Sequence, residues 1–529
     1  MTTHIDTLWL FLLPSKCTHD NLPCTLLLLL LLFLVVSFFH WSHPGGPAWG
    51  RYYSWIRKTT PVIPGPRGLP LLGSIPLMSS SLAHRRIAAA ASACNASRLM
   101  AYSLGHTRVI VSCHPDVSRE ILNSPVFADR PIKESAYSLM FNRAIGFAPY
   151  GLYWRTLRRI AANHLFSPKQ IKASESYRSE IAAQMVGVFG SEIDDYKGFP
   201  VRHVLKKASL SHMMCSVFGK CYRVDESNWE MEELSRLVEE GYDLLGTLNL
   251  GDHLPWLSDL DAQRIRLRCS KLVPKVNRFV GKILADHRAE NDRTNRDFVD
   301  VLLSLHEPDK LSDSDMVAVL WEMIFRGTDT VAILIEWILA RMVLHPDVQS
   351  KVQAELDRVV GKSRAVTEAD VVAMVYLPAV VKEVLRLHPP GPLLSWARLA
   401  NTDTSIDGHH VPKGTTAMVN MWAIARDPIV WRDPLKFIPE RFVSSEGDGE
   451  FSVFGSDLRL APFGSGRRTC PGKSLGFATV TFWVASLLHE FQWLPSGENE
   501  VDLSEVLRLS SEMANPLMVK ACPRRGGLG

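Results

Sequence analysis

Pro462-Phe463-Gly464-Ser465-Gly466-Arg467-Arg468-Thr469-Cys470-Pro471-Gly472 is the most informative stretch of this 529-residue sequence. Its glycines permit an irregular backbone that can pass close to a flat ligand. Pro471 suits the first position of a helix, which places Cys470 at the helix N-terminus. There the helix dipole and the free N–H groups stabilise a thiolate and predict a lowered thiol pKa. The stretch therefore predicts a cysteine that binds a metal as a thiolate.

Two other interpretations of this loop are a structural cysteine and a dinucleotide-binding glycine loop. Gly464-Ser465-Gly466 begins like GxGxxG, but Thr469 stands where the third glycine is needed and no βαβ pattern surrounds it. A thiolate in such a loop suits the axial position of haem iron, where its electron donation favours O–O bond cleavage. Arg468 adds a cation that can pair with a haem propionate.

The overall composition excludes several classes of protein. Hydrophobic residues make up 46% of the chain, and its 59 basic and 55 acidic residues leave a net charge of +4. No basic block is interleaved with aromatic residues, so nucleic acid is not an expected partner. The nine cysteines are scattered and contain no CxxC pair, which argues against a disulfide framework and a zinc cluster and favours a reducing cytosol.

An apolar run near the N-terminus predicts a membrane anchor. Residues 22–41 carry no charged side chain, and twenty helical residues span roughly 30 Å, the thickness of a bilayer core. A cleaved secretory signal is the alternative, but the leader has only Lys16 as a basic residue and no small-residue cleavage pattern follows. Basic residues then follow the run, at Arg51, Arg57, Lys58 and Arg67. By the positive-inside rule they predict a lumenal segment 1–21 and a cytosolic body.

The segment after the anchor, residues 42–70, is predicted to be a basic and proline-rich linker. Pro61-Val62-Ile63-Pro64-Gly65-Pro66-Arg67-Gly68-Leu69-Pro70 contains too many prolines for a helix or a central strand. Prolines at this density make a semi-rigid spacer. No second linker, repeat or low-complexity tract follows, so residues 71–529 are predicted to form one catalytic domain.

The catalytic domain is predicted to be mainly α with a small β portion. A hairpin is expected over 100–105 and 108–113, and further strands are expected around the turn Asp407-Gly408. The longest helix is expected to start near Ser312–Ser314, to end before His345-Pro346 and to be buried. Its middle contains Gly327-Thr328-Asp329-Thr330, where glycine and back-bonding threonines can open the helix.

The cysteine loop matches the cytochrome P-450 signature Phe-x-x-Gly-x-Arg-x-Cys-x-Gly at every fixed position, and residues 60–525 resemble that superfamily in the order of their motifs. The resemblance implies the cytochrome P-450 fold, with a long central helix over haem b and Cys470 as the axial iron ligand. It also implies a set of residues that contact the haem: Phe463, Gly464, Arg468, Gly472, Trp154, Arg158 and Arg398.

The ExxR spacing of Glu383 and Arg386 puts both side chains on one helical face. The same spacing occurs elsewhere in the chain, and only the motifs that follow single out this copy: His388-Pro389-Pro390, then Pro439-Glu440-Arg441-Phe442, then the cysteine loop. This order resembles the family's Glu–Arg–Arg cluster with Arg441 as third member. Its implied role is structural, as a buried salt-bridge network under the haem.

Arg326-Gly327-Thr328-Asp329-Thr330 resembles the family's oxygen-activation motif. The resemblance assigns Thr330 and Asp329 to the delivery of the protons needed for O–O cleavage. Arg326 departs from the small residue usual at the first position, and its charge needs a partner or an outward path. The run from Phe325 to Thr330 also resembles the plant KLUH and PLASTOCHRON-type subfamily, which promotes organ growth.

The resemblance implies a monooxygenase of the endoplasmic reticulum membrane. No flavin or nicotinamide motif is present, so electrons are expected from NADPH through the membrane-bound NADPH–cytochrome P-450 reductase. Positions expected to face the substrate are mostly apolar, which favours a lipophilic and fatty-acid-like molecule: Phe141, Leu320, Ile324, Leu393, Leu394 and Ala514-Asn515-Pro516.

Two further functions are consistent with a haem–thiolate chain. One is a reductase-independent isomerase or dehydratase of fatty-acid hydroperoxides, whose relatives lose the acid–threonine pair and alter the cysteine loop; this chain keeps both. The other is a non-catalytic haem sensor, against which Asp329 and Thr330 argue.

Overall fold

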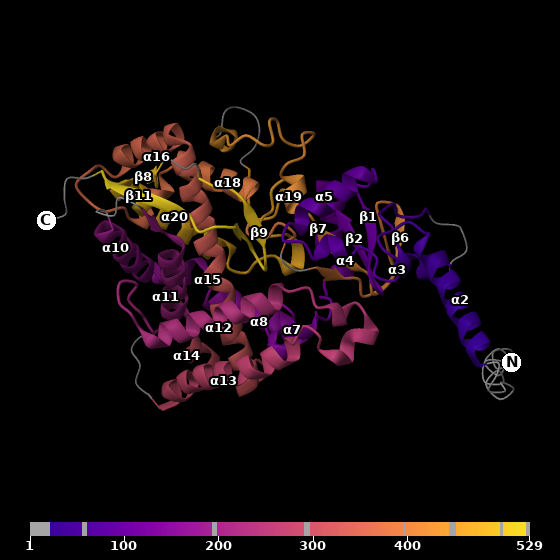
Figure 1. Ribbon diagram of the computed structural model, residues 1–529. Helices are drawn as coiled ribbons and strands as arrows, with labels where there is room; N and C mark the ends of the chain where they lie inside the picture. The colour runs from indigo at the N-terminus through magenta and orange to yellow at the C-terminus, as the bar shows by residue number, and fades with distance from the viewer. Residues whose placement is uncertain are drawn as a thin grey trace.

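Helices form most of the protein, and small separate sheets lie toward both ends of the body and between them (Figure 1). The computed structural model describes residues 22–54, 61–192, 198–289, 297–394, 397–443, 451–497 and 501–524. The predicted lumenal segment 1–21 and the basic residues Arg57 and Lys58 lie outside these ranges.

The α-helices are α2 (Leu22–Trp41), α3 (Pro47–Tyr53), α4 (Ile75–Met78), α5 (Ala83–Ala93), α6 (Pro115–Asn123), α7 (Glu134–Ser138), α8 (Leu152–His164), α9 (Pro168–Ala173), α10 (Glu175–Ser191), α11 (Arg202–Phe218), α12 (Trp229–Gly246), α13 (Ile265–Ala289), α14 (Phe298–Leu303), α15 (Asp313–Leu344), α16 (Pro346–Val359), α17 (Glu368–Val372), α18 (Tyr376–Leu387), α19 (Met421–Ile424) and α20 (Lys473–Glu490). Short 3₁₀ helices are η3 (Pro125–Phe127), η4 (Phe141–Arg143), η5 (Leu250–Asp252), η6 (Pro255–Leu260), η7 (Pro439–Phe442) and η8 (Gly466–Arg468). The strands are β1 (Met100–Leu104), β2 (Thr107–Ser112), β3 (Phe199–Pro200), β4 (Arg398–Leu399), β5 (Thr404–Ile406), β6 (His409–Val411), β7 (Thr416–Val419), β8 (Phe491–Pro495), β9 (Glu505–Leu507), β10 (Ser511–Met513) and β11 (Met518–Pro523).

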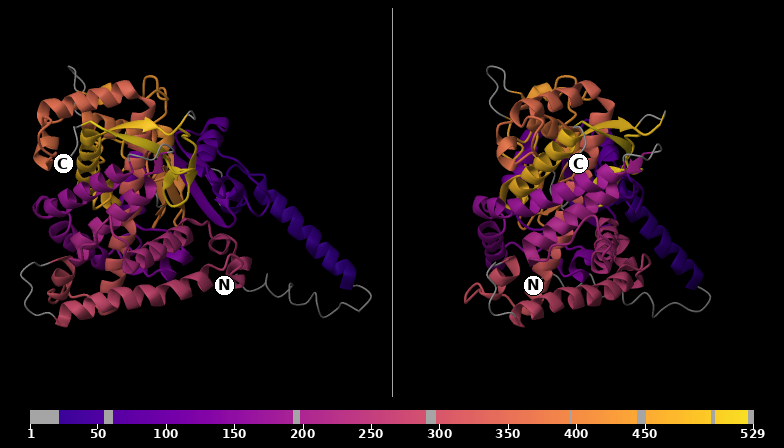
Figure 2. Two further views of the ribbon diagram at one scale, coloured as in Figure 1. Left: turned by 60° about the vertical axis from the view of Figure 1, so that its left-hand side comes forward. Right: turned by 90° about the vertical axis from the view of Figure 1, so that its left-hand side faces the viewer.

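The long helix α15 runs through the middle of the body and divides its core (Figure 2). Its N-terminus is capped by Ser312, whose hydroxyl accepts a hydrogen bond from the Asp315 N–H, and it ends directly before His345. The sequence predicted both ends. The first half packs with α12, α13 and α14, and the second half packs with α16, α18 and α20. The helix is continuous through Gly327, where a Cβ atom would lie 2.3 Å from the sulfur of Met213 on α11. The glycine therefore serves close helix packing, and it does not open the helix.

The largest sheet has the strand order β1-β2-β7-β4. The predicted hairpin forms its first pair, antiparallel from Met100 opposite Val111 to Leu104 opposite Thr107. Strand β2 then pairs with β7 in parallel, and β4 adds on the far edge. The predicted turn at Asp407-Gly408 joins β5 to β6. The mainly helical fold with a small β portion is thus confirmed.

The segment predicted as a linker lies against this sheet. Helix α3, which the sequence analysis did not predict, buries Trp49 completely, and the indole N–H donates to the carbonyls of Tyr102 and Val109 at 3.1 and 3.2 Å. The proline-rich stretch contains no helix or strand and runs beside β1, where the Ala101 N–H donates to the Pro64 carbonyl at 2.9 Å. The contacts of α3 and of this stretch fix where the chain leaves the body toward α2.

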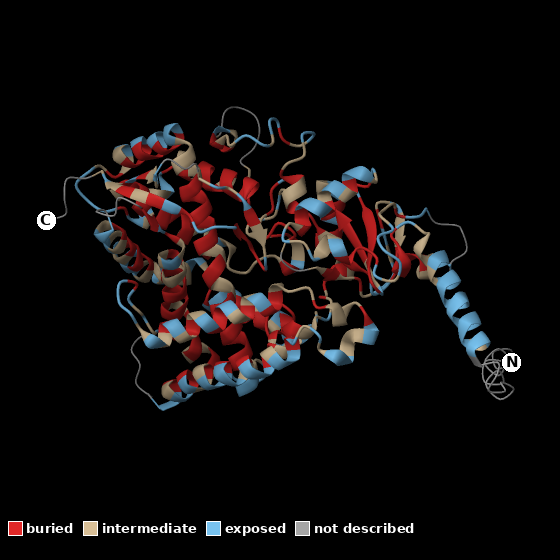
Figure 3. Ribbon diagram, in the orientation of Figure 1, coloured by how far each residue is buried: buried red, intermediate tan, exposed pale blue. Residues whose placement is uncertain are grey.

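Helix α2 projects from the body and is exposed along its length (Figure 3). Its residues 23–41 have a mean hydropathy of 2.5, and none of the most apolar window is buried. Exposed leucine and phenylalanine side chains are costly in water and favourable in a hydrocarbon layer. The helix is therefore consistent with a single-pass membrane anchor.

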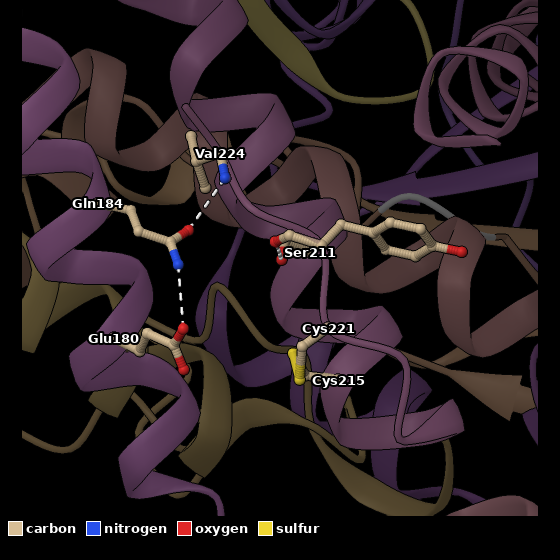
Figure 4. The surroundings of a disulfide bond; sticks show 7 residues. Glu180, Gln184, Ser211, Cys215, Cys221 and Val224 are labelled. Atoms are coloured by element: carbon tan, nitrogen blue, oxygen red, sulfur yellow. Dashed lines mark hydrogen bonds between the residues drawn. A yellow bond between two sulfur atoms is a disulfide. The ribbon is translucent and has the colours of Figure 1, made fainter. Parts of the chain in front are cut away.

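A disulfide joins Cys215 at the end of α11 to Cys221, with Cα atoms 4.5 Å apart (Figure 4). The sequence analysis assigned no cysteine to a disulfide, and for this pair that expectation is wrong. The cause is a tight turn at Gly219 that directs the chain back along α11. The returning segment is held by a hydrogen bond from the Val224 N–H to Gln184 on α10, at 2.9 Å.

The close approach of the proline-rich segment to the sheet gives a first prediction. A Cβ atom at Gly65 would lie 1.8 Å from the carbonyl oxygen of Ala101, so Gly65→Ala forces the two backbones apart. Overpacking of this kind costs about 1–3 kcal/mol of folding free energy. We expect a lower midpoint of thermal unfolding, followed by circular dichroism.

Gly187→Ala is the matched control, because Gly187 lies on the exposed face of α10 with nothing within 4 Å of its Cβ position. Alanine at a helical position is worth up to about 1 kcal/mol over glycine. An equal response of the two variants would contradict the packing of this segment on β1.

Candidate active site

Cys470 lies in a loop that the backbone closes on itself. The Cys470 N–H donates to the Phe463 carbonyl at 2.9 Å, and the Thr469 hydroxyl donates to the same carbonyl at 3.3 Å. Gly466 has a φ of 67° and approaches the Leu122 carbonyl so closely that a Cβ would lie 2.1 Å from it. The loop passes through η8 and leads into α20, which begins at Lys473 and not at the predicted Pro471.

A cavity lies between this loop and α15. Cys470, Phe463, Gly464, Arg468 and Gly472 line its floor. The wall on α15 consists of the residues Glu322, Met323, Arg326, Gly327, Thr330, Val331 and Leu334. Of the positions expected to face a substrate, Leu394 lines this cavity and Leu393 lines a second cavity. Three others are buried in the hydrophobic core, namely Phe141, Leu320 and Ile324. Ala514-Asn515-Pro516 is absent from the described lining of both cavities.

Four arginines converge at one side of the cavity, of which the sequence analysis identified Arg158, Arg398 and Arg468. Their hydrogen bonds go to backbone carbonyls: Arg158 to Thr469 at 2.9 Å, Arg398 to Ser465 at 3.4 Å, and Arg468 to Ala128, Ile145 and Ala148 at 2.6–3.1 Å. The fourth is the buried Arg130, which donates to Gly146 and Ala397. Sequence reasoning missed Arg130 because no local pattern marks it.

Burial and mutual repulsion make this cluster electrostatically unfavourable by itself. Burial lowers the pKa of Arg398 to about 9, and Arg468 and Arg158 lower it further. Burial lowers the pKa of Arg468 to about 10, against the opposing charges of Asp129 and Glu322. Burial also lowers the pKa of Arg130 well below its usual value. Among the described residues no carboxylate lies within 4.0 Å of Arg158, Arg398 or Arg468. A buried arginine cluster of this kind is typical of sites that bind anionic groups.

Trp154, on α8, lies close to two of these arginines. The Arg468 guanidinium is 4.5 Å and the Arg158 guanidinium 5.7 Å from the centre of its rings. The indole N–H donates to the Ile145 carbonyl at 3.0 Å. In this arrangement Trp154 positions the arginines through cation–π contacts and lines the cavity with its ring.

Glu383, Arg386 and Arg441 lie together behind the cysteine loop. Arg386 binds Glu383 through two hydrogen bonds of 2.7 Å, and both side chains are fully buried. Arg441 reaches the same carboxylate at 3.3 Å. The remaining donors of Arg386 bind the carbonyls of Ala425, Pro434 and Lys436. The network thereby holds an irregular segment that leads toward the cysteine loop.

Thr330 and Asp329 occupy different surroundings although they are adjacent. Thr330 lines the cavity, and its hydroxyl donates to the Arg326 carbonyl at 3.5 Å. Asp329 is buried against α11, where Lys206 lies 3.7 Å from its carboxylate. Burial raises the pKa of Asp329 to about 6, and Lys206 opposes that shift. The carboxyl group can therefore carry a proton near neutral pH.

Arg326 has the partner that the sequence analysis left open. Its guanidinium lies 3.8 Å from the carboxylate of Glu322, one helical turn earlier on α15. Glu322 was not among the predicted site residues, although its Glu–Arg spacing of four residues is a sequence signal.

The comparisons with known proteins agree with this geometry. The cytochrome P450 family profile matches residues 63–518. This chain belongs to the cytochrome P450 family. It is 70% identical to cytochrome P450 78A3 of Glycine max, and the match covers 99% of this chain and 100% of that protein. It is 69% identical to cytochrome P450 78A9 of Arabidopsis thaliana, and the match covers 99% of each chain. Flavonoid 3'-monooxygenase of Arabidopsis thaliana is 35% identical, with 87% of this chain and 91% of that protein covered.

Among solved structures, a zebra fish cytochrome P450 with progesterone superposes with a TM-score of 0.71 at 25% identity, covering 83% of this chain and 99% of that structure. Together with the named plant relatives, this likeness establishes the fold and the enzyme class. The chain is a monooxygenase of the cytochrome P450 type, and the predicted likeness to one plant subfamily is confirmed by relatives that all carry the designation 78A.

The residues of this site fit the haem that the family implies. A cavity with a cysteine sulfur on its floor and a cluster of buried cations at its side matches a flat iron complex with two carboxylates on one edge. The thiol itself departs from the expectation, because burial raises the pKa of Cys470 against the opposing effects of Arg326 and the Gly472 N–H. The predicted lowering of the thiol pKa is therefore wrong for the protein without iron, and coordination to iron would stabilise the thiolate.

Loss of one partner in the buried cluster gives a second prediction. Glu383→Gln keeps the side-chain shape but leaves the Arg386 cation without its counter-charge, which costs about 3–5 kcal/mol in a buried pair. We expect a strongly lowered unfolding midpoint and loss of bound haem, followed by circular dichroism and the Soret absorbance of the purified chain.

Glu175→Gln is the control, because its partner Lys172 is 70% exposed and surface pairs contribute about 0–1 kcal/mol. Equal stability of the two variants would show that the Glu383 network does not stabilise this part of the fold.

Proposed function

We propose that this P450 oxidises a lipophilic, fatty-acid-like substrate at the endoplasmic reticulum membrane, with electrons from NADPH through NADPH–cytochrome P-450 reductase, in a plant organ-growth pathway. The observation that carries the proposal is the placement of Cys470 on the floor of the cavity with Thr330 on its α15 wall. The names of the relatives support the class, because they are cytochromes P450 and one of them a monooxygenase.

The proposal assigns each part of the site a task. Arg130, Arg158, Arg398 and Arg468 would hold the two haem carboxylates, and the Cys470 sulfur would ligate the iron. Haem b, when bound, supplies the iron at which dioxygen is reduced and split. Apolar side chains such as Val331 and Leu334 exclude water from the space above and favour a hydrocarbon substrate.

Proton supply falls to Thr330 and Asp329. Thr330 lines the cavity, and its hydroxyl, which donates to the Arg326 carbonyl when no ligand is bound, would turn to deliver a proton into the cavity; Asp329 takes a proton up beside Lys206. Lys206 is 22% exposed and lies beside the Asp329 carboxylate, so it links that carboxylate to the solvent on the α11 side. A carboxyl group with a pKa of about 6 can bind and release protons at neutral pH.

The electron donor is proposed to dock on the cysteine side. Arg467 is exposed beside the loop and Lys473 is the first residue of α20. Both present positive charge to the surface nearest Cys470, and an acidic partner surface complements it. Helix α2 as membrane anchor would keep the chain in the same membrane as the reductase.

A Cys470→Ser variant tests the proposed function. Microsomes containing the full chain, reductase, NADPH and a medium-chain fatty acid should yield a hydroxylated product, whereas Cys470→Ser should yield none and should lose the thiolate-type spectrum of the reduced carbon monoxide complex. Chromatography with mass spectrometry detects the product. If the wild type shows the normal spectrum but forms no product, the enzyme class stands and the fatty-acid-like substrate is wrong. If the spectrum of Cys470→Ser is unchanged, Cys470 is not the iron ligand.

Thr330→Ala tests the proton assignment separately. Without the hydroxyl, NADPH oxidation should continue while product formation falls by roughly tenfold or more, as is usual for loss of a positioned proton donor. The ratio of product formed to NADPH consumed measures this uncoupling. Thr328→Ala is the control, because the Thr328 hydroxyl is buried and donates to the Ile324 carbonyl at 2.7 Å, outside the cavity. Full coupling in Thr330→Ala would exclude the proposed role.

A further inference from the structure

A second cavity, with a lysine in its wall, lies beside the active-site cavity. Apolar residues of β1, β2 and β7 and the end of α12 line most of it. Leu509 lines both cavities, and Leu393 lines the second where the adjoining Leu394 lines the first. The two cavities are therefore neighbours with a shared apolar boundary. Lys133 is half-buried and lines the second cavity.

The Lys133 amine has less compensation than a buried charge needs. It donates to the Leu245 carbonyl at 2.6 Å, at the end of α12, where the helix offers only a partial negative charge. Burial lowers the pKa of Lys133 to about 8, and Asp252 opposes that shift. Asp252 forms no ion pair with Lys133 in the described part of the chain, and its carboxylate accepts from the Glu134 N–H at 3.1 Å. An ammonium group has three donors, so Lys133 can donate further hydrogen bonds to a ligand.

The charges around the second cavity favour an anion. Lys133 and Arg508 place two positive charges in its wall, and Asp252 places one negative charge there. The Arg508 guanidinium lies 3.4 Å from the carboxylate of Glu512, so it has a counter-charge. Burial lowers the pKa of His253, which also lines the cavity, to about 4, so this side chain is neutral. A carboxylate would give Lys133 the full counter-charge that a carbonyl dipole cannot give.

We propose that Lys133 binds the carboxylate of the substrate, so that this enzyme selects unesterified carboxylic acids with an alkyl chain over their esters. The inference rests on the proposed function and narrows its substrate class. The carboxylate stays in the second cavity, and the hydrocarbon chain passes Leu509 into the active-site cavity, beside Val331 and Leu334. Because one end of the chain is held, Lys133 also limits which carbons reach the reacting position.

Dodecanoate and its methyl ester test the proposal, because they share the alkyl chain and differ in charge. Their affinities for the full-length, haem-loaded protein are measured by equilibrium dialysis with labelled ligand, which does not depend on a response of the iron. Titrations are run at about pH 7, below the pKa of Lys133 and above the ordinary carboxyl range. In Lys133→Gln the charge is lost, while the amide group keeps a donor for the Leu245 carbonyl. We expect dodecanoate to bind about tenfold or more weakly than to the wild type, as is usual for a lost hydrogen bond to a charged group, and the ester to bind equally well.

Two further variants make the test specific. Lys133→Met keeps most of the length of the side chain and should show the same selective loss of dodecanoate. Lys271→Gln removes one charge from the exposed face of α13, outside the lining of both cavities, and should keep the wild-type ratio of the two affinities. A purely structural role of Lys133 would weaken both ligands alike and leave that ratio unchanged. With reductase and NADPH, Lys133→Gln should also hydroxylate dodecanoate at a wider range of carbons than the wild type.

The outcomes separate this inference from the proposed function. An unchanged affinity ratio in Lys133→Gln and Lys133→Met, with reductase-driven hydroxylation intact, would overturn the role of Lys133 and leave the monooxygenase. A loss of the ratio in Arg326→Gln instead would also overturn it and would place the carboxylate in the active-site cavity. A wild type that has the thiolate-type carbon monoxide spectrum but binds neither dodecanoate nor its ester would remove the fatty-acid-like substrate, and this inference with it.

Discussion

The buried ion pair between Glu383 and Arg386 is the interaction on which the rest of the site depends. Both side chains are withdrawn from water, so their desolvation has to be balanced by close hydrogen bonds on every side. Arg386 binds three backbone carbonyls, and Glu383 accepts from the Ile438 N–H at 2.9 Å. The segment between α19 and η7 has little regular secondary structure of its own. Its backbone groups find their partners in this pair, and the position of the cysteine loop follows from it.

A second constraint is the excess of positive charge at the cavity. Four arginines converge where their described hydrogen bonds go to backbone carbonyls, and burial lowers the pKa of each, with Glu322 as a partial counter-charge to Arg130, Arg158 and Arg468. Two haem carboxylates would relieve this repulsion, and the iron would do the same for the thiolate of Cys470. Anything that binds the folded state alone stabilises it, so folding and cofactor binding are coupled in this chain. The charges at this site favour the protein with its cofactor bound and are unfavourable for the folded protein without it.

Features with a local cause could be predicted from the sequence. The caps of α15, the β1–β2 hairpin and the order of motifs around Cys470 depend on residues that are close in the chain. Features with a long-range cause could not. Helix α3 exists because Trp49 fits under β1, and Cys221 meets Cys215 because the chain turns at Gly219. Arg130 and the raised pKa of Cys470 likewise depend on what the fold brings around them, which no spacing reveals.

The two buried acids of α15 have different surroundings although they lie on one helix. Glu322 and Asp329 are seven residues apart, which is about two turns, so they project from nearly the same side of the helix. Their neighbours differ: Glu322 meets Arg326 and the cavity, whereas Asp329 meets Lys206 of α11 beyond the cavity edge. A proton can reach Asp329 from the partly exposed Lys206 without crossing the space that holds a substrate. The path proposed for protons therefore lies on the α11 side of the helix, while Glu322 contributes charge to the cavity wall.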